Sequence, residues 1–263
     1  MTNITDREYW SSLWDEEKYE EALPYIREAA KAGDAYAHFC LGEAYLFGIE
    51  VKQSPSLAAS HLVVAANAGF YHAQFLLGNM HRAGEGVPQN DKTAFLLFKA
   101  AAEEIPEAQN NLGLCYLEGR GTRKNYKKAF ALFLSAAEAG VPEAQGNVAR
   151  CYQEGDGVEK DEKAAFLWFK KAAAQDDINS CAILGCCYFN GQGTRKNYQK
   201  AAELFLRAAE AGSPEAQYNL GVCYLNGRGV KKELATAKEW FRKALENGFE
   251  EAEEILADLT ENG

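Results

Sequence analysis

Small and apolar residues recur at helical spacing along the chain, in segments separated by glycine-containing loops. In one unit, Ala108 and Leu112 lie on one side of a segment that stops at Gly119. A second apolar stripe runs over about 126–139 and is followed by Gly140. Glycine accepts the left-handed backbone that closes a helix. The pattern therefore predicts units of two short helices, each ended by a glycine.

Three markers repeat in phase: a Leu-Gly pair, a tyrosine three residues later, and a Gly-x-Gly loop. A fixed period between about 20 and 50 residues is typical of stacked-repeat proteins. The small residue of the pair leaves room for the two helices of a unit to approach closely. We therefore predict an all-α fold with about 36 residues per repeat. The small residue of the pair falls at Gly42, Gly78, Gly113, Ala149, Gly185 and Gly221.

One unit carries the full pattern at Ala216, Leu220, Gly221, Tyr224, Gly227, Gly229, Ala237, Trp240, Phe241 and Ala244. This pattern resembles the Sel-1-like repeat family, which is related to tetratricopeptide repeats, over roughly residues 34–248. The resemblance implies a right-handed α-solenoid of stacked antiparallel helix pairs that serves as an adaptor or scaffold for other proteins. It implies no chemistry.

The repeats set the expected domain organisation. We expect residues 1–33 to form N-terminal capping helices as a degenerate repeat, 34–248 to form six repeats, and 249–263 to form a C-terminal capping helix, because a solenoid needs polar end faces. The first unit has residues 48–51 in place of Gly-x-Gly, and the second ends in 104–106 without its closing glycine. Both departures should loosen the local geometry.

Composition excludes few classes of protein. The chain is 47% hydrophobic and 25% charged, which is ordinary for a globular protein. No apolar run approaches the roughly 18 residues that a membrane span needs, and the polar N-terminus does not resemble a secretory signal. We therefore expect a cytoplasmic protein that has no membrane partner.

Seven cysteines lie in the predicted first helices, and none lies in a second helix. The Helicobacter cysteine-rich members of the family that this chain resembles link first to second helix within a unit, so that arrangement is absent. Equivalent positions in neighbouring repeats should lie about 9 Å apart, beyond the roughly 7 Å limit for a disulfide. We predict free core thiols, with metal binding as a minor alternative. The four that directly precede the repeat tyrosine are Cys115, Cys151, Cys187 and Cys223.

Signatures of catalysis are missing from the sequence. It contains no Walker-type phosphate loop, no G-x-S-x-G elbow and no H-E-x-x-H zinc motif. The Gly-x-Gly loops recur in nearly every unit, so they end helices rather than bind phosphate. The four histidines do not form an evident ligand set: His38, His61, His72 and His81. We predict a protein that is not an enzyme and that has no cofactor or metal.

The first helices should line the inner, concave face of the solenoid. The positions three before, one after and four after the Leu-Gly glycine vary in chemistry while framework positions repeat. We predict that this face holds an extended segment or helix of another protein, with Phe39, Phe75 and Tyr218 as aromatic anchors. The alternative is that these side chains pack between repeats. The predicted partner-binding residues are Phe39, Glu43, Leu46, Phe75, Asn79, Arg82, Asn110, Leu114, Leu117, Arg150, Gln153, Phe189, Tyr218, Val222 and Leu225.

The loops between helices form a second candidate surface. The net charge is −10, yet these loops are basic in the later units. The cations could complement helix dipoles at about 0.3–1 kcal/mol each, or they could bind an acidic protein. Nucleic acid is disfavoured because no aromatic residues alternate with the cations and the chain is acidic. This basic edge comprises Arg120, Arg123, Lys124, Arg195, Lys196 and Arg228.

Together these observations predict a protein-binding adaptor that is a monomer or a weak oligomer. Three alternatives stay open from the sequence. The first is a dedicated inhibitor or immunity-type protein that blocks one toxin or enzyme. The second is a hydrolase on a repeat scaffold, although the sequence shows no nucleophile–base pair. The third is a self-assembling scaffold.

Overall fold

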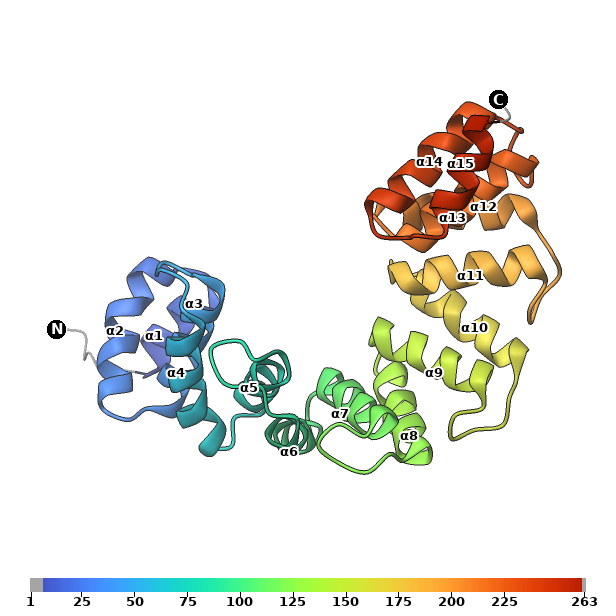
Figure 1. Cartoon of the computed structure of the whole chain (residues 1–263). Coiled ribbons are helices and arrows are strands. Elements are labelled where there is room, and N and C mark those ends of the chain that lie inside the picture. Colours follow the sequence, from blue (N-terminus) through green and yellow to red (C-terminus); the bar gives the residue numbers. More distant parts are fainter. Residues whose placement is uncertain (1–6, 262–263) are drawn as a thin grey trace. The chain divides into compact units, whose positions relative to one another are not determined.

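The computed structural model describes residues 7–261, which form fifteen helices and no strand (Figure 1). This arrangement confirms the predicted all-α fold. The helices are α1 (Arg7–Asp15), α2 (Tyr19–Lys31), α3 (Ala35–Phe47), α4 (Pro55–Asn67), α5 (Tyr71–Ala83), α6 (Asp91–Ala101), α7 (Pro106–Glu118), α8 (Tyr126–Glu138), α9 (Pro142–Glu154), α10 (Glu162–Ala173), α11 (Ile178–Asn190), α12 (Tyr198–Glu210), α13 (Pro214–Asn226), α14 (Leu234–Glu246) and α15 (Ala252–Glu261).

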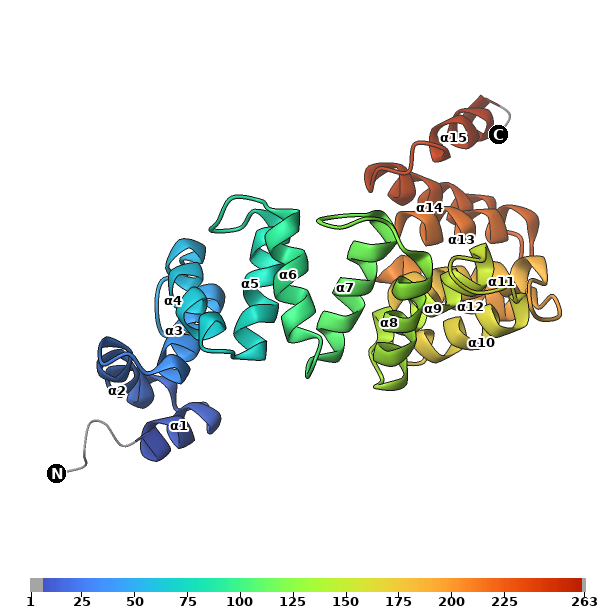
Figure 2. The same ribbon diagram turned by 90° about the horizontal axis from the view of Figure 1, so that it is seen from below.

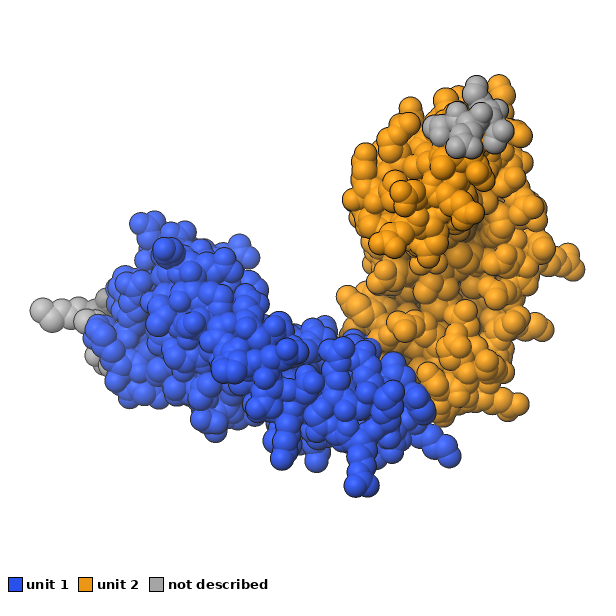
Figure 3. All heavy atoms as spheres, viewed as in Figure 1, with its two compact units in different colours: residues 1–132 blue, residues 133–263 orange. Residues whose placement is uncertain are grey.

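The chain divides into two compact units, unit 1 (residues 1–132) and unit 2 (residues 133–263), coloured blue and orange in Figure 3. Within each unit, the helices pack on their neighbours in the chain, so that α3 lies against α4 and α11 against α12. Figure 2 shows this side-by-side pairing for α5 and α6. Each unit has its own buried core, built around Trp10 and Ile26 at the start of unit 1 and around Phe169 and Phe205 in unit 2.

The glycine of the Leu-Gly pair lies against the large side chain of the second helix. A Cβ atom added to Gly78 would lie 2.7 Å from Phe98, and one added to Gly185 would lie 2.6 Å from Phe205. Real Cβ contacts are longer than this, so the two helices approach as closely as they do because the side chain is missing. At Ala149 in unit 2 the same position holds a buried alanine instead.

The two loop glycines have different roles. Gly119 ends α7 in the left-handed conformation with φ 79°, and its N–H donates to the carbonyl of Cys115. Gly121 lies over the first turn of α6, where an added Cβ would be 2.2 Å from the carbonyl oxygen of Asp91. The loop therefore closes one helix and packs against the start of the preceding one.

The departures from the repeat pattern have defined geometry. Glu50 takes a positive φ of 52° where later loops have a second glycine, and Asp176 takes a φ of 60° where other units end in glycine. The helix before residues 104–106 is α6, with 11 residues against 13 in α4 and α8. The expected start of the last helix at Phe249 was wrong, because α15 begins at Ala252 after a turn.

No helix in the described part of the chain has the length and apolar character needed to cross a lipid bilayer.

Candidate functional site

A small cavity lies in unit 1 where α5, α6 and α7 meet. Its volume is about 70 Å³. Arg82 comes from the last turn of α5, Asp91 begins α6, and Asn111 and Leu114 lie on α7. The remaining lining residues are Ala94, Cys115, Glu118 and Arg120. The predicted inner face and the predicted basic edge therefore meet here, because Arg82 and Leu114 belong to the first and Arg120 to the second.

Several lining groups have partners inside unit 1. Arg120 Nε lies 2.6 Å from Glu118 Oε2, and Asn111 Nδ2 donates to Asn79 Oδ1 at 2.9 Å. The guanidinium of Arg82 lies over the ring of Phe98 at 6.0 Å and has no ion-pair partner among the described residues. Asp91 Oδ1 is buried and accepts no hydrogen bond from residues 7–261. The cavity thus presents an exposed cation without an ion pair and a buried acceptor that lacks a donor.

The other predicted residues of unit 1 have internal packing roles. Phe39 stacks near Phe70 with ring centroids 6.4 Å apart, and Phe75 packs on Phe98 at the same centroid separation. Leu46 packs against the core of α4 and α5. All three side chains are half-buried, as is Leu117, so part of each remains accessible.

Asn110 was expected to be an exposed inner position, and this was wrong. Its side chain is only 7% exposed. The equivalent residues Gly146 and Ala182 in unit 2 are buried as well. The reason is steric: the position three residues before the Leu-Gly glycine turns partly toward the neighbouring helices, where only a large side chain extends back to the surface.

In unit 2 the predicted residues differ in accessibility. Arg150 is exposed and Gln153 is half-buried. Tyr218 contacts Phe249 and Phe241, with ring centroids 4.9 Å and 5.5 Å away. The remaining predicted residues of this unit are half-buried and pack against neighbouring helices: Phe189, Val222 and Leu225. Every aromatic anchor proposed from the sequence therefore also contributes to packing; partner contact by these rings stays a prediction.

The basic edge is partly used within the protein. Besides Arg120, Arg228 lies over the rings of Phe189 and Tyr198 at 5.2 Å and 5.6 Å. The aliphatic stems of Lys124 and Lys196 lie against Gly119 and Gly191. Arg123 and Arg195 are exposed. These internal contacts leave fewer cations available for an acidic partner than the sequence indicated.

Burial shifts the pKa of several titratable groups in and around the two units. Burial raises the pKa of the Glu43 carboxyl to about 7, while a hydrogen bond from Trp14 opposes this shift. All seven cysteines are free, and burial raises the pKa of the Cys115 thiol to about 11. His38 and His61 share a hydrogen bond between their Nδ1 atoms at 2.9 Å. The sequence did not suggest this pair, because its members lie on different helices.

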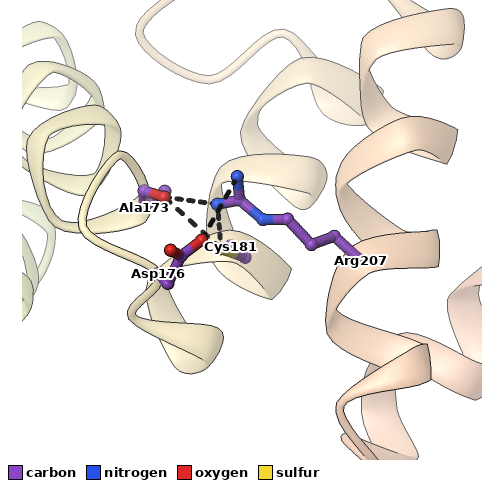
Figure 4. Close-up of polar contacts among 4 residues, drawn as sticks. All are labelled: Ala173, Asp176, Cys181 and Arg207. Atoms are coloured by element: carbon purple, nitrogen blue, oxygen red, sulfur yellow. Dashed lines mark hydrogen bonds and ion pairs between the residues drawn. The ribbon is translucent and has the colours of Figure 1, made fainter.

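A polar cluster in unit 2 was also missed (Figure 4). Arg207 of α12 donates to the carbonyl oxygen of Ala173 at the end of α10 and contacts Cys181 Sγ. Its Nη1 atom lies 3.9 Å from Asp176 Oδ1. A cation at a helix C-terminus complements the helix dipole, so this cluster is a structural clamp between consecutive helices. The signal in the sequence was Asp176, which replaces the glycine that closes most other units.

Comparison with known proteins gives the same repeat boundaries as the helices. The sequence model of the Sel1 repeat matches residues 35–70, 72–104, 106–141, 142–177, 178–213 and 214–249. A tetratricopeptide repeat model matches residues 11–46, which include most of α1, all of α2 and most of α3. A curated relative, human protein sel-1 homolog 2, is 33% identical over 99 residues. That match covers 36% of this chain and only 14% of the relative.

Solved structures of repeat proteins are similar over most of the chain. A Sel1 repeat protein from Oxalobacter formigenes has a TM-score of 0.83 and 28% identity, covering 92% of this chain and 97% of its own. A protective antigen of uropathogenic Escherichia coli with an SLR fold has a TM-score of 0.79 and 32% identity, with 92% and 52% covered. An immunity protein from Pseudomonas aeruginosa has a TM-score of 0.51 and 18% identity over 81% of each chain, which shows a shared fold alone.

Proposed function

This chain belongs to the Sel1 repeat family, and from that premise we propose that it binds another protein through the face formed by its first helices. The repeat scaffold is of the kind used in protein–protein interaction. The proposal includes no catalysis and no cofactor. The partner would contribute an extended or helical segment that lies along this face.

The cavity between α5, α6 and α7 is the observation that carries the proposal. Asn79, Arg82 and Leu114 were selected because they occupy variable positions in a regular repeat, and all three lie in or beside the cavity. Packing does not explain a buried carboxylate oxygen that lacks a donor, and the exposed Arg82 beside it is accessible to a partner. A partner side chain would donate to Asp91 Oδ1 and accept from Arg82.

Charge reversal of Arg82 tests the proposal. We expect the full chain to capture a specific protein from lysate of its own organism, and Arg82→Glu to reduce that capture at least about tenfold, equivalent to about 1.4 kcal/mol. Quantitative mass spectrometry of the captured proteins measures the change. Arg150→Glu applies the same test to unit 2.

Lys99→Glu on α6 is the matched control, because Lys99 is exposed on a second helix. It should leave capture unchanged. Equal capture by wild type, Arg82→Glu and Arg150→Glu would rule out the first-helix face as the binding surface.

The same experiment separates an adaptor from a dedicated inhibitor of one toxin or enzyme. Similarity to an immunity protein extends only to the fold, so it does not decide between them. An adaptor should capture its partner with moderate affinity and release it on washing. A dedicated inhibitor should retain one enzyme stoichiometrically and abolish the activity of that enzyme.

A further inference from the structure

The size of the α5–α6–α7 cavity limits what it can hold. Its volume of about 70 Å³ is far below the roughly 300–1,000 Å³ of pockets that bind small-molecule ligands. One water needs about 10–15 Å³ by the same measure, so the cavity has room for a group of a few heavy atoms. One side chain of a partner segment has that size.

The charges around the cavity limit which chemical group of a partner can bind there. The ion pair between Arg120 and Glu118 neutralises two of the four charged lining residues. The two that remain are Arg82, which offers N–H donors, and Asp91, whose buried Oδ1 needs a donor. The complementary group must therefore accept a hydrogen bond at one end and donate one at the other.

A carboxamide meets both requirements within four atoms, because its oxygen accepts and its NH₂ group donates. A carboxylate would satisfy Arg82 but would place a second negative charge beside Asp91. An ammonium group would satisfy Asp91 but would place a second positive charge beside Arg82. Leu114 and Ala94 supply apolar walls for the methylene stem of such a side chain.

The combination of Arg82 and Asp91 occurs in one repeat. The residues equivalent to Arg82 in the other units are Leu46, Leu117, Gln153, Phe189 and Leu225. None of them combines a cation with an acidic residue at the start of the following helix. Framework residues recur in a repeat array, so a combination that occurs once is not explained by the framework.

We infer that the cavity between α5, α6 and α7 binds an asparagine or glutamine side chain of the partner segment. This inference rests on the proposed function, since the side chain belongs to a bound protein. Its oxygen accepts from Arg82, and its NH₂ group donates to Oδ1 of Asp91.

Three small probes test the inference without knowledge of the partner: N-acetyl-glutamine methylamide, N-acetyl-glutamate methylamide and N-acetyl-norleucine methylamide. Each is titrated at millimolar concentration into the full ¹⁵N-labelled chain, and amide shifts are followed by NMR. The glutamine probe should shift the side-chain amide of Asn111 and the backbone amides of Gly119 and Arg120. The glutamate probe should bind at least about tenfold more weakly, and the norleucine probe should cause no shift at these sites.

Asp91→Asn provides a readout that a structural role would not change. The substitution keeps the shape of the side chain and removes its charge, so the preference should reverse in favour of the glutamate probe. Arg82→Gln should abolish binding of the glutamine probe, while Arg123→Gln at an exposed position should not. Circular dichroism checks that each variant is folded.

A preference of the wild-type chain for glutamate, equal binding of all three probes, or no shift at Asn111 up to the solubility limit would overturn the inference. If the probes fail while Arg82→Glu still prevents capture of the partner, the carboxamide assignment is wrong and the interaction face stands. If the probes bind as expected while Arg82→Glu leaves capture unchanged, the cavity binds carboxamides and the proposed interaction face is wrong.

Discussion

At the scale of single residues, ionisation of the buried Glu43 carboxyl should lower the stability of the folded protein. Its carboxyl lies on α3 among Trp14 and neighbouring side chains, and burial raises its pKa from 4.5 to about 7. In the unfolded chain the pKa returns to its ordinary value. Between these two values the folded state binds more protons than the unfolded state, so stability decreases as the pH rises through this window.

Glu43→Gln removes this dependence. We expect the variant and the wild type to have similar free energies of unfolding below pH 4.5, where both side chains are neutral. At pH 8 the variant should be more stable by about 1–2 kcal/mol, after allowance for partial exposure. Urea unfolding at several pH values measures the difference. Glu20→Gln, at an exposed position, is the control, and a difference independent of pH would contradict the argument.

The candidate site could be predicted in part at this scale. Variable positions on a regular repeat identified Asn79, Arg82 and Leu114, because packing fixes the other positions. Asp91 was not predicted, since it lies at the start of a second helix and reaches the cavity only through the packing of three helices. Asn110 was misjudged because helical periodicity gives the direction of a side chain and not what a neighbouring helix places over it.

At the scale of helices, the contact between the Leu-Gly glycine and the second-helix aromatic ring determines how closely a pair packs. Gly185→Ala places a Cβ 2.6 Å from Phe205. Overpacking costs about 1–3 kcal/mol, and the better helix propensity of alanine returns about 1 kcal/mol. We expect a net loss of about 1 kcal/mol in the free energy of unfolding, and a larger loss for Gly185→Val.

A second substitution tests whether the contact between the added methyl group and Phe205 causes the loss of stability. Phe205→Leu in the Gly185→Ala background makes room for the added methyl group, so the double variant should be more stable than the sum of the two single changes predicts. Denaturant unfolding of the four proteins gives the coupling energy. Strict additivity would mean that the glycine matters for another reason.

The ends of the helices could be predicted from the sequence more readily than their starts. Glycine ends are visible because they recur, as at Gly119. The asparagine that begins second helices is less obvious: Asn125 Oδ1 accepts from Lys128 N at 3.0 Å, and Asn197 does the same for Lys200 N. An N-cap of this kind contributes about 1 kcal/mol. The sequence Thr-Arg-Lys-Asn-Tyr precedes both α8 and α12, so the repetition of this asparagine is the signal for the cap.

At the scale of the whole molecule, stability should be local. Within each unit, helices contact their neighbours in the chain. A substitution that weakens the packing of one helix should therefore destabilise the adjacent helices first. Phe205→Ala should cost about 3–5 kcal/mol. Hydrogen exchange should accelerate in α11, α12 and α13, while amides of α2 to α5 keep their protection. Uniform acceleration along the chain would show that the two units unfold as one.

The second glycine of a loop repeatedly packs against the first turn of the second helix in the preceding repeat, as Gly121 does at Asp91 and Gly193 does at Glu162, which makes the boundaries between these repeats equivalent. Because the boundaries are equivalent, whole repeats can be duplicated or deleted without further substitutions at the boundary. The near-identity of residues 119–129 and 191–201 preserves the trace of such an event, two repeats long. A cassette copied in this way brings its surface residues with it, so the array can acquire a new specificity in the same step in which it becomes longer.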